Sequence, residues 1–215
     1  MAPVPSLILL GAGGHAKVLL ALAAAAGMTV DGVCDPGLAD RGEASWHGIA
    51  VLGGDAALAR CDPAEVRLIN GLGQVAGGTR RAALFAECVA RGFLFPPLVH
   101  PAAWVAPTAR LGQGVQVMAG AVVQPDVVIG ANSIVNTRAS IDHDCALGQD
   151  VHIAPGAVLC GSVRVADGAF VGSGATIIQG LSVGRGAIVG AGAVMVRDLA
   201  AGSFLLAALG PVRPA

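Results

Sequence analysis

One short stretch of the chain gathers titratable side chains of the kind that acid–base catalysis uses. Asp142, His143 and Asp144 follow one another in the sequence Ser-Ile-Asp-His-Asp-Cys. A histidine titrates near neutral pH and can accept a proton from a substrate. Eighteen residues after His143 stands Gly161, whose backbone N–H a ligand can approach closely because glycine has no side chain. A base beside such a donor suits acyl transfer, in which one group takes a proton and the other stabilises an oxyanion.

The spacing of eighteen has a structural meaning because the surrounding chain is periodic. From Leu98 to Leu199 the sequence divides into seventeen consecutive rows of six residues. The second position of every row is Val, Leu, Ile or Met, and the last is mostly Ala. A fixed short period is typical of a solenoid, and one inward aliphatic per row fits three short strands around a triangular coil. We therefore predict a left-handed parallel β-helix over residues 98–199, followed by a C-terminal tail over 200–215.

Three rows make one coil, so residues eighteen apart are expected on neighbouring coils about 4.8 Å apart. This rule places Gly161 beside His143. His152 follows His143 by nine residues, which is half a coil, and is therefore expected near a different edge of the prism. The two imidazoles can serve one site only where another subunit packs alongside. Flat faces of small and apolar residues favour a homotrimer with its sites at the subunit interfaces.

Residues 1–97 alternate short apolar runs with helical patterns and predict a small Rossmann-like α/β domain with a parallel sheet. Only three or four strands precede the solenoid, too few for a fold that clasps a dinucleotide, so a single nucleotide or a nucleotide diphosphate is the expected ligand. The expected strands are 6–10, 29–34, 66–70 and 93–95, and the expected helices are 17–26, 55–59 and 79–91.

A glycine-rich turn follows the first expected strand. Its sequence, Gly11-Ala12-Gly13-Gly14-His15-Ala16, fits the pattern G-x-G-x-x-A, with Asp35 about twenty residues on. Glycines here let backbone N–H groups and a helix N-terminus approach a phosphate. The alternative is a purely structural glycine turn. His15 would then be an exposed residue at the start of the helix rather than part of a phosphate loop.

The composition excludes several classes of function. The net charge is −1 and Lys and Arg are not clustered, which argues against binding to nucleic acid or an anionic membrane. The mean hydropathy is high, but the longest apolar stretch, Val18 to Val30, is too short to span a bilayer. No basic segment typical of a signal peptide is present, so we expect a cytoplasmic protein. The five cysteines form no CxxC pair and are expected to be reduced thiols.

The order of these motifs resembles a known family. The segments G-A-G-G-H-A, D-P, N-T-x-A-x-I-D-H-D-C and V-H-I-A-P-G-A are similar to those of the bacterial nucleotide-aminosugar acetyltransferases, a sialic-acid O-acetyltransferase-like hexapeptide-repeat family. The resemblance covers nearly the whole chain. It implies N-acetylation, from acetyl-CoA and without a metal, of the 4-amino group of a nucleotide-linked 4-amino-4,6-dideoxyhexose for surface polysaccharide or glycan synthesis. GDP-perosamine is the favoured sugar nucleotide, and a UDP-linked sugar is the other candidate.

The resemblance also implies roles for individual residues. His143 would be the general base, Asp144 would raise its basicity, and the backbone of Gly161 would face the thioester and its oxyanion. The residues in contact with acetyl-CoA would be His152, Gly161, Ser173 and Ala191. The residues that hold the nucleotide sugar would be Gly13, Gly14, His15, Asp35, Pro36 and Gly73, with Asn136 near the amine of the sugar.

The sequence departs from the family pattern at two places. Asp144 is one carbon shorter than the Glu that some relatives carry. The segment Leu209–Arg213 lacks the family's G-x-P-A-K ending, and Arg213 is the candidate to replace its lysine in binding the phosphates of CoA.

Three other functions are compatible with parts of this pattern. The first is O-acetylation of a sugar hydroxyl with the same residues. The second is a metal hydrolyase such as the γ-type carbonic anhydrases, which share the β-helix but need three histidines on one site. His100, His143 and His152 are forty-three and nine residues apart and do not stack on a common edge. The third is a non-catalytic nucleotide-binding module.

Overall fold

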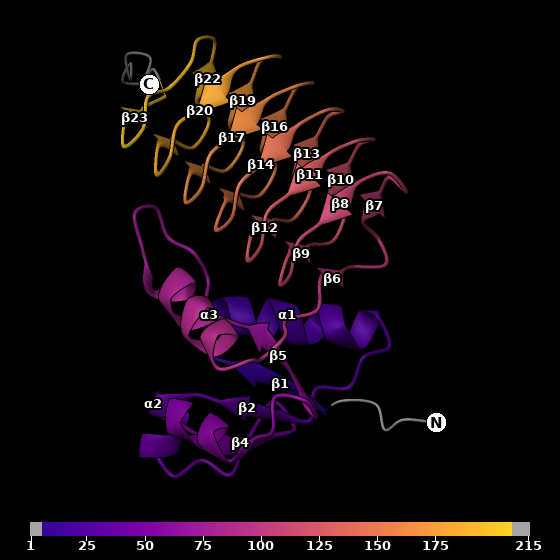
Figure 1. The fold of residues 1–215 in the computed structure, drawn as a ribbon, viewed down its shortest axis with the longest axis vertical. Helices are drawn as coiled ribbons and strands as arrows, with labels where there is room; N and C mark the ends of the chain where they lie inside the picture. Colours follow the sequence, from indigo (N-terminus) through magenta and orange to yellow (C-terminus); the bar gives the residue numbers. More distant parts are fainter. Residues whose placement is uncertain (1–5, 208–215) are drawn as a thin grey trace, which may run out of the picture.

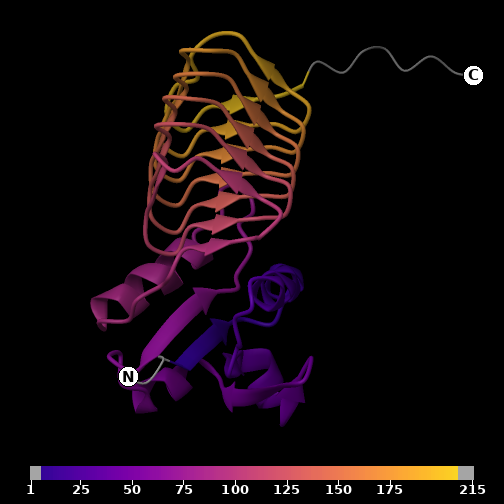
Figure 2. The same cartoon turned by 90° about the vertical axis from the view of Figure 1, so that its right-hand side faces the viewer.

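The computed structural model describes residues 6–207, which form a small α/β unit with a prism of stacked coils on top of it (Figures 1 and 2). The α/β unit is built around a five-stranded sheet with the strand order β3-β4-β2-β1-β5. Its strands are β1 (Ser6–Leu10), β2 (Gly32–Cys34), β3 (Ser45–Trp46), β4 (Ile49–Gly53) and β5 (Val66–Asn70). Its helices are α1 (Gly14–Ala25), α2 (Pro36–Asp40), the 3₁₀ helix η1 (Asp55–Arg60) and α3 (Arg80–Ala90).

Helix α1 begins directly after the glycine-rich turn and ends as the sequence indicates. Gly27 has a φ of +69°, and its N–H and that of Met28 donate to the carbonyls of Ala24 and Ala23. These two bonds satisfy carbonyls that the helix leaves unpaired, as glycine does at many helix ends. The helix starts at Gly14, three residues earlier than predicted, so the last glycine of the turn is its first residue.

The prediction of three or four strands in this unit is wrong. A hairpin of β3 and β4 was missed, and it makes the sheet mixed because β3 pairs antiparallel with β4. His47 and Gly48 have φ values of 47° and 82° and form a two-residue turn of the kind that joins hairpin strands. Residues 93–95 are not a strand, because only Leu94 makes a single bridge to Arg67. Strand β2 is shorter than the predicted strand 29–34, and it is followed by the short helix α2, which was not predicted.

The parallel β-helix predicted from the six-residue rows is confirmed. Each row contributes a two-residue strand, and residues eighteen apart are paired, as Ser140 is with Val158. The prism continues past residue 199 into the predicted tail, because Phe204 and Leu205 pair with Ile188 and Val189. The strands are β6 (Leu98–Val99), β7 (Trp104–Val105), β8 (Arg110–Leu111), β9 (Gln116–Val117), β10 (Val122–Val123), β11 (Val128–Ile129), β12 (Ile134–Val135), β13 (Ser140–Ile141), β14 (Ala146–Leu147), β15 (His152–Ile153), β16 (Val158–Leu159), β17 (Arg164–Val165), β18 (Phe170–Val171), β19 (Thr176–Ile177), β20 (Ser182–Val183), β21 (Ile188–Val189), β22 (Val194–Met195) and β23 (Phe204–Leu205).

Three parallel sheets form the faces of the prism. We call them the β13 sheet (β22-β19-β16-β13-β10-β7), the β14 sheet (β20-β17-β14-β11-β8) and the β15 sheet (β23-β21-β18-β15-β12-β9-β6). The second residue of nearly every row points inward and is buried, as Ile141, Ile153 and Leu159 are. Stacked aliphatics thus fill the interior, and this packing fixes which residues reach each corner of the prism.

The α/β unit packs against the lower coils of the β15 sheet. Leu98, Met118 and Ile134 join Leu19 and Leu22 of α1 in one buried cluster. None of the helices in the part of the chain from 6 to 207 is long and apolar enough to cross a membrane.

A buried arginine ties the end of β5 to the prism. Arg81 is 2% exposed, and its guanidinium donates to the carbonyls of Asn70, Leu72 and Asn132. Gln116 of the prism also donates to the carbonyl of Asn70, at 2.9 Å. The two parts are therefore held together by polar bonds as well as by apolar packing.

Candidate active site

The first group of candidate residues occupies the corner of the prism that follows β13. His143 Nδ1 lies 2.7 Å from Asp144 Oδ2. An ionised carboxylate can only accept a hydrogen bond, so Nδ1 carries the hydrogen and Nε2 keeps its lone pair. Asp144 has a φ of +61°, and this turn folds its side chain back onto the preceding residue. The side chain of aspartate, although shorter than that of glutamate, therefore reaches the imidazole.

The surroundings of His143 make it a stronger base. The hydrogen bond to Asp144 and the negative charge of Asp142 raise the pKa of His143 above its ordinary value. Both His143 and Asp144 are exposed, each with 59% of its side-chain area accessible. A ligand can therefore reach the imidazole from solvent.

Gly161 lies directly against this imidazole. A Cβ at Gly161 would be 2.7 Å from His143 Cε1 and 2.8 Å from Nε2, closer than real side chains approach. The N–H of Ser162 donates to the carbonyl of His143 and fixes the two coils relative to each other. Within residues 6–207, the Gly161 N–H donates to no hydrogen bond. The stacking rule thus brings a base and an unused donor together, as the spacing of eighteen predicts.

A second group lies where the α/β unit meets the β15 sheet. His15 Nε2 is 2.8 Å from Gln116 Oε1, so the imidazole points toward the prism. Gly73 lies against the Cβ of His15. On the prism, His152 Nε2 is 3.3 Å from Asn136 Nδ2, and its ring contacts Phe170 at a centroid distance of 4.9 Å.

Burial keeps both histidines of this junction neutral. It lowers the pKa of His15 and of His152 to about 4, so neither is charged near neutral pH. His152 is only 6% exposed, and its Nδ1 is buried without a hydrogen-bond partner within the described chain. Because Asn136 Nδ2 can only donate, Nε2 of His152 is the acceptor and Nδ1 carries the hydrogen.

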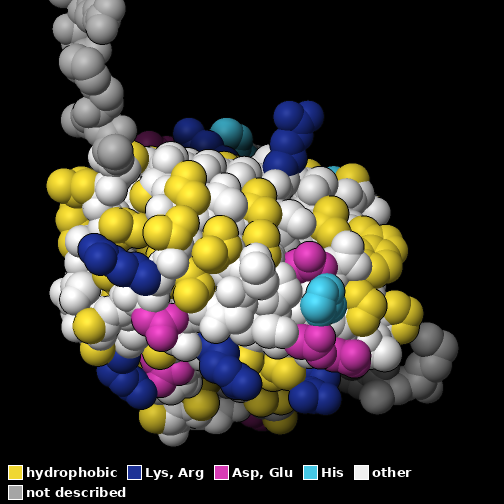
Figure 3. Space-filling model, turned by 90° about the horizontal axis from the view of Figure 1, so that it is seen from above, with side chains coloured by type: hydrophobic (Ala, Val, Ile, Leu, Met, Phe, Trp, Pro, Cys, Tyr) yellow, Lys and Arg dark blue, Asp and Glu magenta, His cyan; other side chains and the backbone are white. Residues whose placement is uncertain are grey.

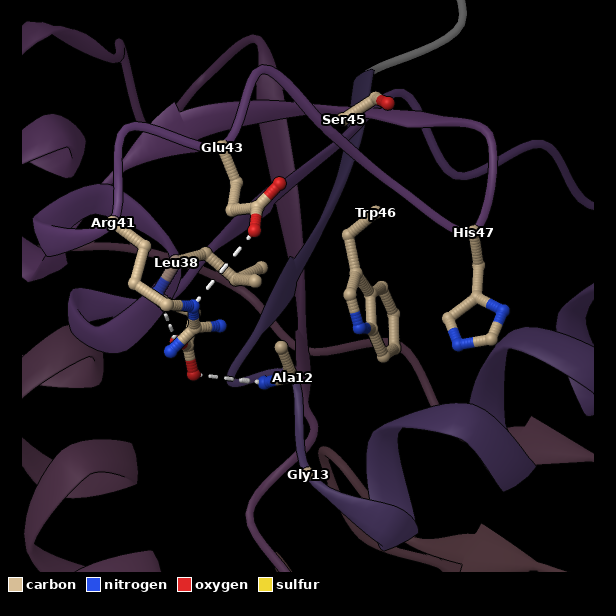
Figure 4. Close-up of a pocket in the computed structure, with 9 residues that line it drawn as sticks. Ala12, Gly13, Leu38, Arg41, Glu43, Ser45, Trp46 and His47 are labelled. Carbon is tan, nitrogen blue, oxygen red and sulfur yellow. Dashed lines mark hydrogen bonds and ion pairs between the residues drawn. The ribbon is translucent and has the colours of Figure 1, made fainter.

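A third group surrounds an open pocket of about 520 Å³ in the α/β unit (Figure 4). It lies at the carboxyl ends of β1 and β2, where ligands bind in parallel α/β sheets. Asp35 accepts from the N–H of Ala12 at 3.0 Å and of Leu38 at 2.9 Å. The pocket is lined by Ala12, Gly13, Asp35, Leu38, Arg41, Glu43, Ser45, Trp46 and His47.

The structure divides the residues expected to hold a nucleotide sugar. Gly13 and Asp35 line the pocket, with Gly14 and Pro36 beginning the helices that follow them. His15 is turned away to the junction, so it lies neither in a phosphate loop nor fully exposed. The pocket residues from Arg41 to His47 were missed. The dipeptide His47-Gly48 was the available signal, because a residue before glycine between two short apolar runs marks a hairpin turn.

Ser173 and Ala191 lie at a different corner from His143. They follow β18 and β21 of the β15 sheet and stack on neighbouring coils, where the N–H of Gly192 donates to the carbonyl of Ser173. A single chain therefore does not bring them to the His143–Gly161 corner. Arg213 lies outside the described residues.

No metal-binding group is found in the part of the chain that the structure describes. Between residues 6 and 207, no three side chains of His, Cys, Asp or Glu are placed so that they could share a metal ion.

Two known protein families match different parts of the chain. Residues 6–81 match the PglD N-terminal domain. Residues 108–143 and 144–179 match the bacterial transferase hexapeptide family (six repeats).

Several solved structures are similar to this chain over almost its whole length. The acetyltransferase domain of PglB from Neisseria gonorrhoeae FA1090, in complex with acetyl coenzyme A, is 40% identical, with 94% of this chain and 96% of that chain covered and a TM-score of 0.84. PerB from Caulobacter crescentus, in complex with CoA and GDP-perosamine, is 38% identical, with 94% of each chain covered and a TM-score of 0.84. A histidine-to-asparagine mutant of perosamine N-acetyltransferase from Caulobacter crescentus, also with CoA and GDP-perosamine, is 36% identical, with 94% and 93% covered and a TM-score of 0.83.

Proposed function

The chain belongs to the bacterial hexapeptide-repeat acetyltransferases with a PglD-type N-terminal domain, and we propose that it transfers an acetyl group from acetyl-CoA to a nucleotide-linked amino sugar. The acceptor is the 4-amino group of a 4-amino-4,6-dideoxyhexose, with GDP-perosamine favoured. The observation that carries this proposal is the placement of His143 Nε2 beside the unused N–H of Gly161. Relatives with bound acetyl-CoA, or with CoA and GDP-perosamine, support the same substrates here.

The chemistry needs one base and one oxyanion donor. The neutral amine of the sugar attacks the thioester carbonyl carbon, and the carbonyl oxygen becomes an oxyanion that accepts from the N–H of Gly161. His143 Nε2 removes the excess proton from the nitrogen. The tetrahedral intermediate then collapses, the C–S bond breaks, and CoA leaves as a thiolate that takes up a proton. Asp144 holds the imidazole through Nδ1 and stabilises its charged form.

The two parts of the chain bind different substrates. Residues 1–97 hold the nucleotide sugar, with Gly13, Gly14, Asp35 and Pro36 at the pocket and His15 and Gly73 at the junction beside it. Residues 98–199 hold acetyl-CoA and the catalytic corner. Asn136 and His152 lie next to each other on the prism, and His152 is near His15 and Arg81 of the α/β unit, which supports a role near the sugar and the thioester.

The separation of these groups supports a homotrimer with sites between subunits. His143 and Gly161 lie at one corner of the prism, while His152, Ser173 and Ala191 lie on the β15 sheet and its own corner. A neighbouring prism can bring the second set to the first. The outer face of the β13 sheet exposes Trp104, Val158 and Val194, and apolar side chains are spread across the surface seen in Figure 3. Light scattering on the purified chain tests the trimer.

We place the reaction in the cytoplasm, since all five cysteines are free thiols, as in proteins of a reducing compartment.

An assay of free thiol release from acetyl-CoA tests the function. Purified protein is offered GDP-, UDP- and dTDP-linked 4-amino-4,6-dideoxyhexoses, each paired with the sugar nucleotide that carries a hydroxyl at the same carbon. We expect release with an amino sugar and none with its hydroxyl partner. Release with the hydroxyl sugars alone would assign an O-acetyltransferase instead. No release with any member of the panel, from protein that binds nucleotides, would favour a non-catalytic module.

A further inference from the structure

The pocket of the α/β unit carries two side chains that phosphate and sugar binding leave without a role. Glu43 lies between α2 and β3, Trp46 is the last residue of β3, and both side chains point toward the turn at Ala12 and Gly13 (Figure 4). The backbone N–H of Glu43 donates to the carbonyl of Leu38, which ties the segment to α2. This bond fixes the backbone from which the Glu43 side chain extends into the pocket.

Trp46 offers a flat apolar surface in a fixed orientation. It is half-buried and pairs with Ile49 across the hairpin. The ring of His47 meets the indole edge-on, with centroids 4.6 Å apart and planes at 87°. An aromatic ring held in this way is a stacking platform for a nucleic-acid base, because every base has a π face.

Glu43 offers hydrogen-bond acceptors that the chain does not use. Its carboxylate is 3.9 Å from Arg41 Nε, which is longer than a hydrogen bond, and half of its side-chain area is exposed. The guanidinium of Arg41 also lies near Asp35, because a Cβ at Gly37 would be 3.4 Å from Arg41 Nη1 and 3.3 Å from Asp35 Oδ1. The pocket thus presents two acceptor oxygens beside a planar donor.

The groups that line the pocket fit the parts of a nucleotide. Gly13 lies at the N-terminus of α1, which attracts phosphate. Asp35 lies at the end of β2, the position that contacts ribose in related sheets. Arg41 and Glu43 lie on one side of Ala12 and Trp46 on the other (Figure 4), and the base would lie between Glu43 and Trp46.

We propose that Glu43 and Trp46 form a base subsite that selects guanine over uracil, so that the substrate is a GDP-linked sugar. This inference rests on the proposed function for its nucleotide sugar. Guanine presents two adjacent donors, N1–H and the N2 amino group, which match the two oxygens of one carboxylate. Its O6 is an acceptor that an arginine can reach. Uracil presents a single N–H between two carbonyl oxygens, and one of these would face the carboxylate of Glu43 with like charge.

Calorimetric titration of the full chain with GDP and with UDP tests the proposal. We expect GDP to bind at least about tenfold more tightly, since a bidentate contact to a base discriminates on this scale. Glu43→Gln should weaken GDP binding about tenfold or more and should not weaken UDP binding, since it removes the charge that repels a uracil carbonyl, so that the preference is lost. Trp46→Ala should weaken both. The matched control is Asp40→Asn, which removes one exposed negative charge from the end of α2 outside the pocket and should change neither.

Two results would overturn the base assignment: UDP binding as tightly as GDP to the unmodified chain, or an unchanged preference in Glu43→Gln. The proposed function and the base subsite can be tested independently of each other. If GDP binds in a Glu43-dependent manner but no GDP-linked amino sugar is acetylated, the base subsite stands and the proposed function is wrong. If UDP-linked amino sugars are acetylated in preference to GDP-linked ones, the reaction stands and the base subsite is wrong.

Discussion

His143 and Gly161 are eighteen residues apart in sequence, yet a single added carbon on Gly161 would lie within 2.8 Å of the imidazole Nε2. The two residues come from successive coils of one sheet, following β13 and β16. The glycine is thus required for two reasons at once, since it leaves room for the imidazole and exposes its own N–H beside the base.

Replacement of His143 tests its role as the base. His143→Ala should lower kcat by roughly 10²–10⁴-fold, the range typical for a positioned proton acceptor. Binding of CoA should change little, because the imidazole is exposed and makes no contact that supports the fold. Steady-state kinetics and calorimetric titration with CoA measure the two quantities. A turnover near that of the unmodified enzyme would contradict the assignment.

The bond between His143 and Asp144 predicts a change in the pH profile. The base works only as neutral imidazole, so activity falls as the pH drops through the pKa of His143, which Asp144 raises. Asp144→Asn removes this effect, so the acid limb of kcat against pH should move to lower pH. The plateau rate should also fall because the base is weaker. A profile with an unmoved acid limb would mean that another group titrates.

A methyl group at Gly161 should disable the site without unfolding the chain. In Gly161→Ala the new Cβ displaces the His143 ring and crowds the N–H, and we expect kcat/KM to fall by about 10²-fold or more, as with loss of an oxyanion donor. The φ of Gly161 is not in the left-handed region, so backbone strain is not expected. Thermal melting should therefore stay close to that of the unmodified chain. Retained activity at equal stability would remove Gly161 from the site.

The arginine at the junction should matter for stability. Arg81→Met leaves the carbonyls of Leu72 and Asn132 without their donor, while the carbonyl of Asn70 keeps its bond from Gln116. Each unsatisfied buried group costs about 1–3 kcal/mol. We expect the free energy of unfolding to fall by about 2–5 kcal/mol, measured by urea denaturation. Arg80→Met is the matched control, because the neighbouring side chain is exposed and should tolerate the same change. Equal effects of the two variants would contradict the structural role of Arg81.

The periodic part of the chain was predictable to the residue. Inward aliphatics at every sixth position determine the pairing of Ser140 with Val158, and this register in turn places Gly161 beside His143. Such an inference works because each coil repeats the geometry of the one before. A local sequence rule therefore carries three-dimensional information over the whole prism.

The α/β unit was predictable only in part. The first strand of the hairpin that carries Trp46 has only two residues, and the dipeptide His47-Gly48 was the local signal for its turn. The turning of His15 toward the prism depends on Gln116, which is 101 residues away, and no local spacing reveals such a contact. The hairpin could therefore be suspected from the sequence, but the junction could not.

The coil length also limits how this enzyme can change in size. Adding one six-residue row between His143 and Gly161 would move the glycine to another face, and only insertions of a whole coil preserve the face while separating the two residues. No insertion in that interval leaves the site intact. A further whole coil above Ala191 would extend the prism without moving His143 or Gly161. The length of the prism beyond the site is therefore less constrained by this geometry than the interval of eighteen.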